Sequence, residues 1–369
     1  MRCKRRHRSH CGRTDSKRTP TKGTHPTTSG LTGSGPAEQT GTLTAPTDGT
    51  VDAPLGLFSP TSVWNRPLAA DASLDPSSAT RMAAFFNQIK SEEAAGIGPW
   101  INTTSYSTTI YVVGPNQPRV PVILDKTASG QLASVLSSGV PIPAGAKPSA
   151  GTDAEMTIYQ PSTDSLWEFW VASLQADGWH ARWGGAMSHV SASPGYFSNL
   201  SWPGLASWDG WFWGASATSL PIAAGTITIN DLKSGAINHA LAIAVPFPCS
   251  GSFTWPAQRT DGSSTAPDCL PEGAHLRLDP TLDLSKLSLP PITRMLAVAA
   301  QRYGIIVRDK TNRETTFVAE TPTGTNPYIG TGGLFGGLQP WQFLPPFPWS
   351  HLQLLKMNLC TARPCAEPS

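Results

Sequence analysis

Glu155 and Glu168, near the middle of the chain, are the carboxylates whose spacing best suits acid–base chemistry. They belong to two runs of alternating polar and apolar residues, at 155–160 and 165–171, separated by the turn formers Pro-Ser-Thr-Asp. This pattern predicts a β-hairpin in which the two carboxylates are diagonal neighbours, roughly 7–8 Å apart at the backbone. Two such groups, one of them desolvated by aromatic neighbours, can separate their pKa values and act as acid and base. Glycoside hydrolysis requires a pair of this kind.

The register of the hairpin decides which side chains share a face. If the four-residue loop closes the hairpin directly, Gln160 lies opposite Ser165 and Thr157 lies opposite Glu168. One face is then apolar and belongs to the core, and it carries Met156, Ile158, Trp167, Phe169 and Val171. The other face, which we expect to line an open groove, carries Glu155, Thr157, Tyr159, Leu166, Glu168 and Trp170.

Glu168 is therefore the predicted acid/base. Asp153, just before the first strand, is its predicted partner, and His239 is a third catalytic candidate. The alternative is structural: Glu168 pairs with Arg182, and Glu155 is solvent-exposed.

A second chemistry, the elimination catalysed by polysaccharide lyases, is also open. In a lyase a His or Tyr removes the proton beside a substrate carboxylate that Arg neutralises. The candidates for these roles are Tyr159, His189, Arg182 and Arg259. His239 lies in an apolar run at 237–245, where the alternative to a base is a hydrogen-bonded core histidine.

A loop and a Trp-rich segment could supply contacts to sugar. Arg259 and Asp261 lie in the loop between Cys249 and Cys269. Residues 189–213 contain four Trp without helical or strand periodicity, which predicts a long ordered loop, and such loops are usually functional. Flat aromatic faces suit pyranose rings, although aromatic loops also serve as plugs on a sandwich. The side chains predicted to contact substrate are Arg259, Asp261, Tyr159, Trp170, Arg182 and His189.

The elements that must position these residues are predominantly strands. The chain has 35 Pro, 34 Gly and 13 Trp at only 14% charged residues, which favours an all-β protein with long ordered loops. Helices are predicted at 77–95 and 292–302, and one short helical turn at 229–234. A late hairpin is predicted from 305–308 and 315–320. We expect a jelly-roll-like β-sandwich with two helices and long ordered loops, because no repeat supports a propeller.

Composition divides the chain into three parts. Residues 1–22, with nine Lys or Arg and one Asp, are predicted to form a basic disordered tail. Residues 23–56 read as a Thr/Gly/Ser/Pro-rich linker, and residues 57–369 as a single β-sandwich domain. The whole chain has a net charge of +2, but beyond residue 22 there are 18 basic and 24 acidic residues, a net of −6. This balance disfavours nucleic acid as a partner of the folded domain.

The cysteines indicate an oxidising compartment. Cys249 with Cys269 and Cys360 with Cys365 are the expected disulfides, with unrelated free thiols as the alternative. The basic start is not followed by an apolar run, so no signal peptide is visible as the chain is written. The sequence contains no stretch of 18 apolar residues, so no membrane-spanning helix is predicted. We expect a secreted or cell-wall-associated protein.

Common catalytic and cofactor motifs are missing from the sequence. It contains no Gly-x-Ser-x-Gly, no P-loop, no Gly-x-Gly-x-x-Gly after a strand, no His-Glu-x-x-His and no EF-hand spacing. The sequence also lacks the Cys-x-x-Cys spacing that would indicate a zinc site. We therefore expect no cofactor and no metal, and the sequence leaves the oligomeric state open.

Several short motifs together resemble a largely uncharacterised family of actinobacterial secreted proteins. The resemblance covers about residues 57–360 and rests on Tyr-Gln-Pro-Ser-Thr-Asp-Ser-Leu-Trp-Glu-Phe-Trp, Gly-Trp-His-Ala-Arg-Trp-Gly-Gly, Ile-Asn-His-Ala-Leu and Trp-Pro-Ala-Gln-Arg-Thr-Asp-Gly. It implies export and a cell-wall context but assigns no catalytic residue. Its members carry His where this chain has Glu155. The positions that match the shared pattern are Asp153, Glu168, His239, Arg259 and Asp261.

The function predicted from the sequence is a secreted carbohydrate-active enzyme, either a glycoside hydrolase or a polysaccharide lyase. Its expected partner is a polysaccharide or cell-wall glycan. A non-catalytic glycan-binding or wall-associated module is the alternative, because the same aromatic and polar residues would serve binding alone.

Overall fold

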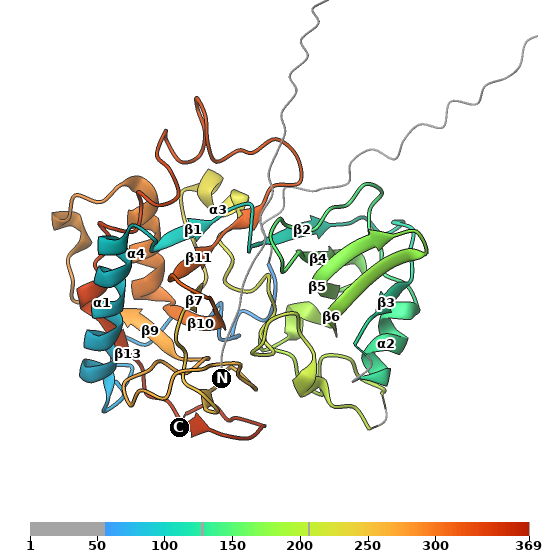
Figure 1. The fold of residues 1–369 in the computed structure, drawn as a ribbon, viewed down its shortest axis with the longest axis horizontal. Helices are drawn as coiled ribbons and strands as arrows, with labels where there is room; N and C mark the ends of the chain where they lie inside the picture. The colour runs from blue at the N-terminus through green and yellow to red at the C-terminus, as the bar shows by residue number, and fades with distance from the viewer. Residues whose placement is uncertain (1–55, 127–128, 206, 369) are drawn as a thin grey trace, which may run out of the picture. The chain divides into compact units, whose positions relative to one another are not determined.

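The computed structural model describes residues 56–126, 129–205 and 207–368, all within one compact unit that spans residues 48–369. The predicted basic tail and nearly all of the linker lie outside the described residues. Two six-stranded mixed sheets, a two-stranded sheet and four α-helices make up the described part, which confirms a mostly-β fold (Figure 1). No helix among these residues is long and apolar enough to cross a membrane.

The first six-stranded sheet contains the central hairpin and is called the β5 sheet below. Its strand order is β12–β2–β4–β5–β6–β3. The bounds are β2 Thr108–Val112, β3 Val122–Leu124, β4 Glu155–Gln160, β5 Ser165–Gln175, β6 Gly178–Ser188 and β12 Glu320–Thr321. Helix α2 (Gly130–Ser137) packs beside β3 and β6 (Figure 1).

The second six-stranded sheet, called the β7 sheet, lies beside the first in Figure 1. Its order is β1–β11–β7–β10–β9–β13. The bounds are β1 Trp100–Asn102, β7 Leu241–Val245, β9 His275–Leu278, β10 Ile305–Lys310, β11 Thr316–Val318 and β13 Leu352–Leu354. Helix α1 (Ser78–Ala95) packs against β13, and α4 (Pro291–Arg302) against β9 and β7. The small sheet pairs β8 (Phe253–Thr254) with β14 (Leu359–Cys360).

The central hairpin has the predicted register. Gln160 pairs with Ser165, and Thr157 pairs with Glu168. The expectation that the polar face is open is wrong for the middle of the hairpin, because Thr157 and Glu168 are fully buried. The reason is that residues 212–222 pack over this face, so the hairpin is covered on both sides.

Three of the four described helices follow the sequence pattern, but α2 was not predicted, and the strand pairing follows the pattern less well. Helices α1 and α4 and the short α3 (Ile229–Ser234) lie where they were predicted. The late hairpin is wrong: β10 and β11 do not pair with each other, because β7 lies between them. The jelly-roll connectivity is not confirmed, since β7 with β10, β2 with β4 and β3 with β6 are parallel, whereas jelly rolls are antiparallel.

Both predicted disulfides are present. The sulfur atoms of Cys249 and Cys269 are 2.06 Å apart, and those of Cys360 and Cys365 are 2.04 Å apart.

Candidate functional site

A cavity of about 740 Å³ lies between the two large sheets and is lined by several charged and aromatic side chains. Its walls come from the central hairpin, from β6, from residues 212–217, from the disulfide-closed loop and from the end of β10. The lining residues with charged, amide or aromatic side chains are Lys126, Asp153, Glu155, Trp170, Trp183, Phe212, Arg259, Asp261, Asp309, Lys310 and Asn312. Four predicted site residues are therefore brought together: Asp153, Trp170, Arg259 and Asp261.

Two carboxylates enter the cavity from the start of the hairpin. Asp153 and Glu155 are two residues apart at the N-terminal end of β4. The backbone here is unusual, because Ala154 has a φ of 39° and Val171, opposite it, has a φ of 53°. The Val171 N–H donates to the Asp153 carbonyl at 2.6 Å, which ties the two strained segments together. Strain of this kind in a β-branched residue is rare and concentrates at functional sites.

Glu155 is the most strongly desolvated of the lining carboxylates. Its side chain is buried, and no described residue donates a hydrogen bond to its carboxylate. Burial raises its pKa well above the usual value; Arg308 opposes this shift, and the negative charges of Asp309 and Asp153 add to it. A protonated Glu155 facing a cavity is suited to donate a proton.

A pair of indoles forms the aromatic wall next to these acids. Trp170 on β5 pairs across the strands with Trp183 on β6. The Trp170 Nε1–H donates to Asp153 Oδ1 at 3.0 Å, which fixes the carboxylate beside the ring. Arg182 lies over the Trp170 ring, 5.3 Å from its centroid, and does not line the cavity.

Glu168, the predicted acid/base, does not reach the cavity. Its two carboxylate oxygens accept the backbone N–H groups of Ala215, at 2.6 Å, and Ile222, at 2.8 Å. It also makes no ion pair with Arg182, which was the structural alternative. Gly185, its partner on β6, permits this arrangement, because a Cβ there would lie 2.9 Å from the Gly214 nitrogen. Glu168 therefore holds residues 215–222 against the sheet behind the cavity.

Burial raises the pKa of Glu168 to about 7, against the lowering effect of its two N–H hydrogen bonds and of Arg308 and Arg259. Between its unfolded value near 4.5 and this raised value, the folded protein holds more protons than the unfolded chain. Stability therefore falls as pH rises through 7. From pH 6 to pH 8 we expect Glu168 to remove on the order of 1 kcal/mol from the free energy of unfolding, measured by urea titration with EDTA present. A free energy of unfolding that rises over this range would contradict the assignment.

Arg259 lines the cavity but is occupied by the backbone. Its Nε–H donates to the Ala217 carbonyl at 2.9 Å, and its Nη2 group donates to the carbonyls of Gly214 and Ser216 at 3.0 and 2.7 Å. Nη1 donates to the Phe212 carbonyl. Burial lowers its pKa to about 10. Since most of its N–H groups are used, Arg259 shapes the wall formed by residues 212–217 more than it offers a site for a carboxylate.

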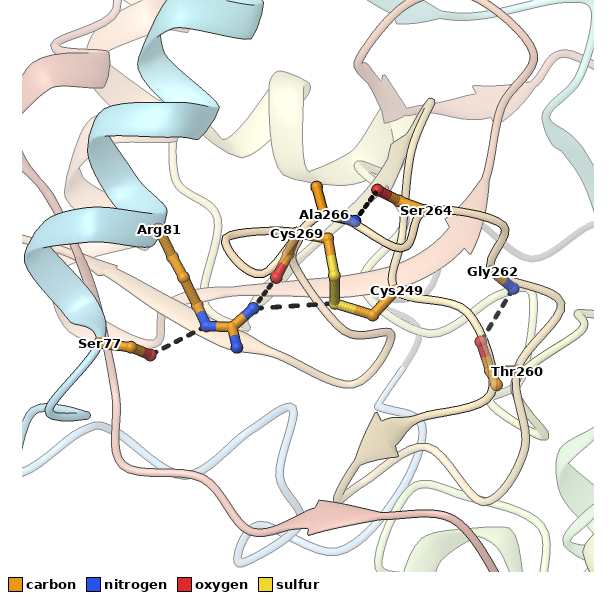
Figure 2. Close-up of a disulfide and its surroundings, with 8 residues drawn as sticks. All are labelled: Ser77, Arg81, Cys249, Thr260, Gly262, Ser264, Ala266 and Cys269. Carbon is orange, nitrogen blue, oxygen red and sulfur yellow. Dashed lines mark hydrogen bonds between the residues drawn. A yellow bond between two sulfur atoms is a disulfide. The ribbon is translucent and has the colours of Figure 1, made fainter.

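The disulfide-closed loop carries Asp261 to the cavity rim. Figure 2 shows Arg81 of α1 reaching the disulfide, where it donates to the Cys269 carbonyl, and Thr260 accepting the Gly262 N–H at 2.9 Å. A Cβ on Gly262 would lie 2.1 Å from the Cys249 carbonyl oxygen, so only glycine allows this turn to pack on the disulfide.

Asp309 and Lys310 were missed by sequence reasoning. They lie at the end of β10, after a register shift between Val307 and Asp309 that leaves Arg308 as an extra residue. Such bulges re-aim side chains and occur beside active sites. Burial, together with the charges of Asp261 and Asp153, raises the pKa of Asp309 to about 7. The sequence signal for these two residues was a charged pair directly after a predicted strand. Their position in the cavity, however, depends on the parallel pairing of β10 with β7.

Three other predicted site residues lie outside the cavity lining. His239 precedes β7, which starts at Leu241, and its Nε2 is 3.2 Å from Asp231 Oδ2, so it belongs to the capping region of α3. Tyr159 is half-buried near Asp164, and His189 is exposed with its Nδ1 3.2 Å from Ser188 Oγ. The structure does not bring these side chains together with Asp153.

One cluster of oxygen ligands could hold a metal ion. Asp261, Glu272 and Asp309 each offer an oxygen, and these atoms lie within 4.8 Å of one another.

Comparisons with protein-family models, with curated proteins and with solved structures find no match to this chain.

Proposed function

We propose that this protein is a glycoside hydrolase that cleaves a neutral polysaccharide in the cavity between the two sheets. The observation that supports the proposal is the placement of two carboxyl groups, Glu155 and Asp153, beside the Trp170–Trp183 pair. A pair of carboxyl groups next to a flat apolar surface is what binding and cleaving a sugar chain requires.

Glu155 is the proposed general acid. It lies in the cavity wall, and burial raises its pKa well above the usual value, which favours the protonated form that a general acid needs. In glycoside hydrolysis this proton goes to the oxygen of the leaving sugar as the glycosidic bond breaks. Asp153 is the proposed second carboxylate, which acts on the anomeric carbon or on the attacking water. Its hydrogen bond from Trp170 orients it for that role.

The charge of the cavity favours hydrolysis over elimination from uronic acids. Four carboxylates line it: Asp153, Glu155, Asp261 and Asp309. A lyase needs a cation to neutralise the substrate carboxylate. Of the three lining cations, Arg259 is bound to backbone carbonyls and Lys310 is paired with Asp261, while Lys126 lies over the Trp170 ring, 5.4 Å from its centroid.

Export and membership of the actinobacterial secreted family remain part of the proposal. The disulfides Cys249–Cys269 and Cys360–Cys365 support an oxidising compartment. A cell-wall or environmental polysaccharide is then the proposed partner.

The test is a panel of neutral and uronic-acid polysaccharides, assayed for reducing ends and for unsaturated products. We expect reducing ends from at least one neutral glycan and no unsaturated product. Retention of a glycan with no product over days would overturn the enzymatic proposal in favour of a binding module. Unsaturated product from a uronate would replace hydrolysis with elimination.

The aromatic wall gives a separate prediction. Replacing Trp183 by Leu removes one face of the platform, and aromatic contacts of this kind contribute about 0.5–1.5 kcal/mol each. We therefore expect the KM of Trp183→Leu to rise about tenfold while kcat changes by less than about threefold. Trp341→Leu is the matched control, because Trp341 is exposed and does not line the cavity. Equal effects of the two substitutions would contradict the placement of the substrate.

A further inference from the structure

Three carboxylates from separate segments converge beside the proposed active site. Asp261 belongs to the disulfide-closed loop between Thr260 and Gly262 (Figure 2), Glu272 precedes β9, and Asp309 is near the end of β10. One oxygen from each lies within 4.8 Å of the other two. Carboxylates at this separation repel one another strongly unless a proton or a cation lies between them.

Glu272 supplies an independent sign that a ligand belongs here. Its side chain is fully buried, and Oε2 accepts the Asp261 backbone N–H at 3.1 Å. Its other oxygen, Oε1, is buried without a hydrogen-bond partner among the described residues. The Thr260 hydroxyl and the Asp261 carboxyl group are close enough to shift the pKa of Glu272, but neither makes a hydrogen bond of normal geometry to Oε1. A buried carboxylate oxygen without a partner is costly, and in native proteins it calls for an explanation such as an ion.

The protein's own cations leave the buried Glu272 Oε1 without a hydrogen-bond partner among the described residues. Lys310 is the one that contacts the cluster: its Nζ lies 3.5 Å from Asp261 Oδ2 and donates to the Asp261 carbonyl at 2.9 Å. Arg259 acts on Asp309 and Glu272, and Arg308 on Asp309, through charge. None of these three cations donates a hydrogen bond to the buried Glu272 Oε1.

The donor set selects the class of cation. The ligands are carboxylate oxygens with a hydroxyl nearby, and the cluster contains no His or Cys, so a hard cation is favoured over zinc or copper. Calcium binds oxygens at about 2.3–2.6 Å, so two of its ligands can be about 5 Å apart. Magnesium retains several waters and prefers one or two carboxylates, which suits three converging carboxylates less well.

We propose that Asp261, Glu272 and Asp309 form a calcium site that locks the disulfide-closed loop onto the end of β10, at the rim of the cavity. The ion would supply the missing partner of Glu272 and cancel the repulsion among the three carboxylates. Since Asp261 and Asp309 also line the cavity, the site would fix that part of its wall.

The experiment measures calcium binding and thermal stability in the absence of any glycan, so its outcome does not depend on the proposed hydrolysis. Full-length protein is stripped with EDTA and titrated with CaCl2 by calorimetry. We expect one calcium ion per chain and a rise in Tm of about 5 °C when calcium exceeds its Kd about 100-fold. MgCl2 and ZnCl2 are tested in parallel and should give a smaller rise.

Two substitutions distinguish the loss of a metal site from a general loss of stability. In Glu272→Gln and Asp309→Asn we expect loss of the calcium-dependent rise in Tm. In EDTA we expect Glu272→Gln to be at least as stable as the unsubstituted protein, because it removes one of three repelling charges. Glu92→Gln is the matched control: Glu92 is also fully buried but accepts hydrogen bonds from Thr315. That variant should have a lower Tm and keep the calcium response.

Three results would overturn the proposal. The first is an unsubstituted protein that neither binds calcium nor gains stability at millimolar CaCl2, as expected if Glu272 is simply protonated. The second is a Glu272→Gln variant that keeps the full calcium response. The third is a larger rise in Tm with magnesium or zinc than with calcium.

Discussion

Replacing Glu155 by Gln is expected to lower kcat for the glycan identified in the panel by about 10²–10⁴-fold, the usual contribution of a general acid. The amide keeps the size of the side chain but cannot give a proton to the leaving sugar. KM should change little, because Glu155 acts on the leaving oxygen and not on the platform formed by Trp170 and Trp183. The measurement is steady-state release of reducing ends, with thermal unfolding of the same variant to show that the fold is intact.

The pH profile of the unsubstituted protein tests the same assignment. Burial raises the pKa of Glu155, and Asp309 and Asp153 reinforce the shift while Arg308 opposes it. A general acid works in its protonated form, so kcat should fall as pH rises through this raised pKa and should not fall at the pKa of an ordinary glutamate.

One control and one further substitution accompany these measurements. Glu93→Gln changes an exposed carboxylate on α1, outside the cavity, and should keep full activity. Asp153→Asn should lower kcat by a factor similar to that of Glu155→Gln, because both carboxyl groups are needed. If Glu155→Gln retains activity while Asp153→Asn loses it, the proton donor is another group.

The local parts of this structure could be predicted because local patterns determine them. The turn formers between Gln160 and Ser165 set the hairpin register, and the observed pairs are those expected. The positions of α1, α3 and α4 could be predicted from capping residues and flanking Gly or Pro residues. The two disulfides followed from the pairing of cysteines around short loops.

The candidate site was predicted only in part because it is assembled from distant segments. Asp153, Trp170, Arg259 and Asp261 were named, but Asp309 comes from β10, whose parallel pairing with β7 has no local signature. The burial of Glu168 could not be predicted from the sequence either. A polar face on a hairpin predicts an open groove only if no other segment covers that face. Here residues 212–222 cover it, and the backbone N–H groups of Ala215 and Ile222 bind Glu168.

Glu168→Gln is expected to act on stability, in contrast to Glu155→Gln. Gln can accept only one of the two N–H groups that Glu168 now binds, so the N–H of either Ala215 or Ile222 faces the side-chain amide NH2, which is itself a donor. An unsatisfied buried donor costs about 1–3 kcal/mol, which corresponds to a fall in Tm of about 5 °C. The part of the pH dependence between 6 and 8 that belongs to Glu168 should vanish with it. At a temperature where the variant is fully folded, kcat should remain within about tenfold of the original, since Glu168 contacts the wall and not the substrate. A loss of kcat as large as that of Glu155→Gln, with an unchanged Tm, would return the catalytic role to Glu168, as predicted from its place on the polar face of the hairpin.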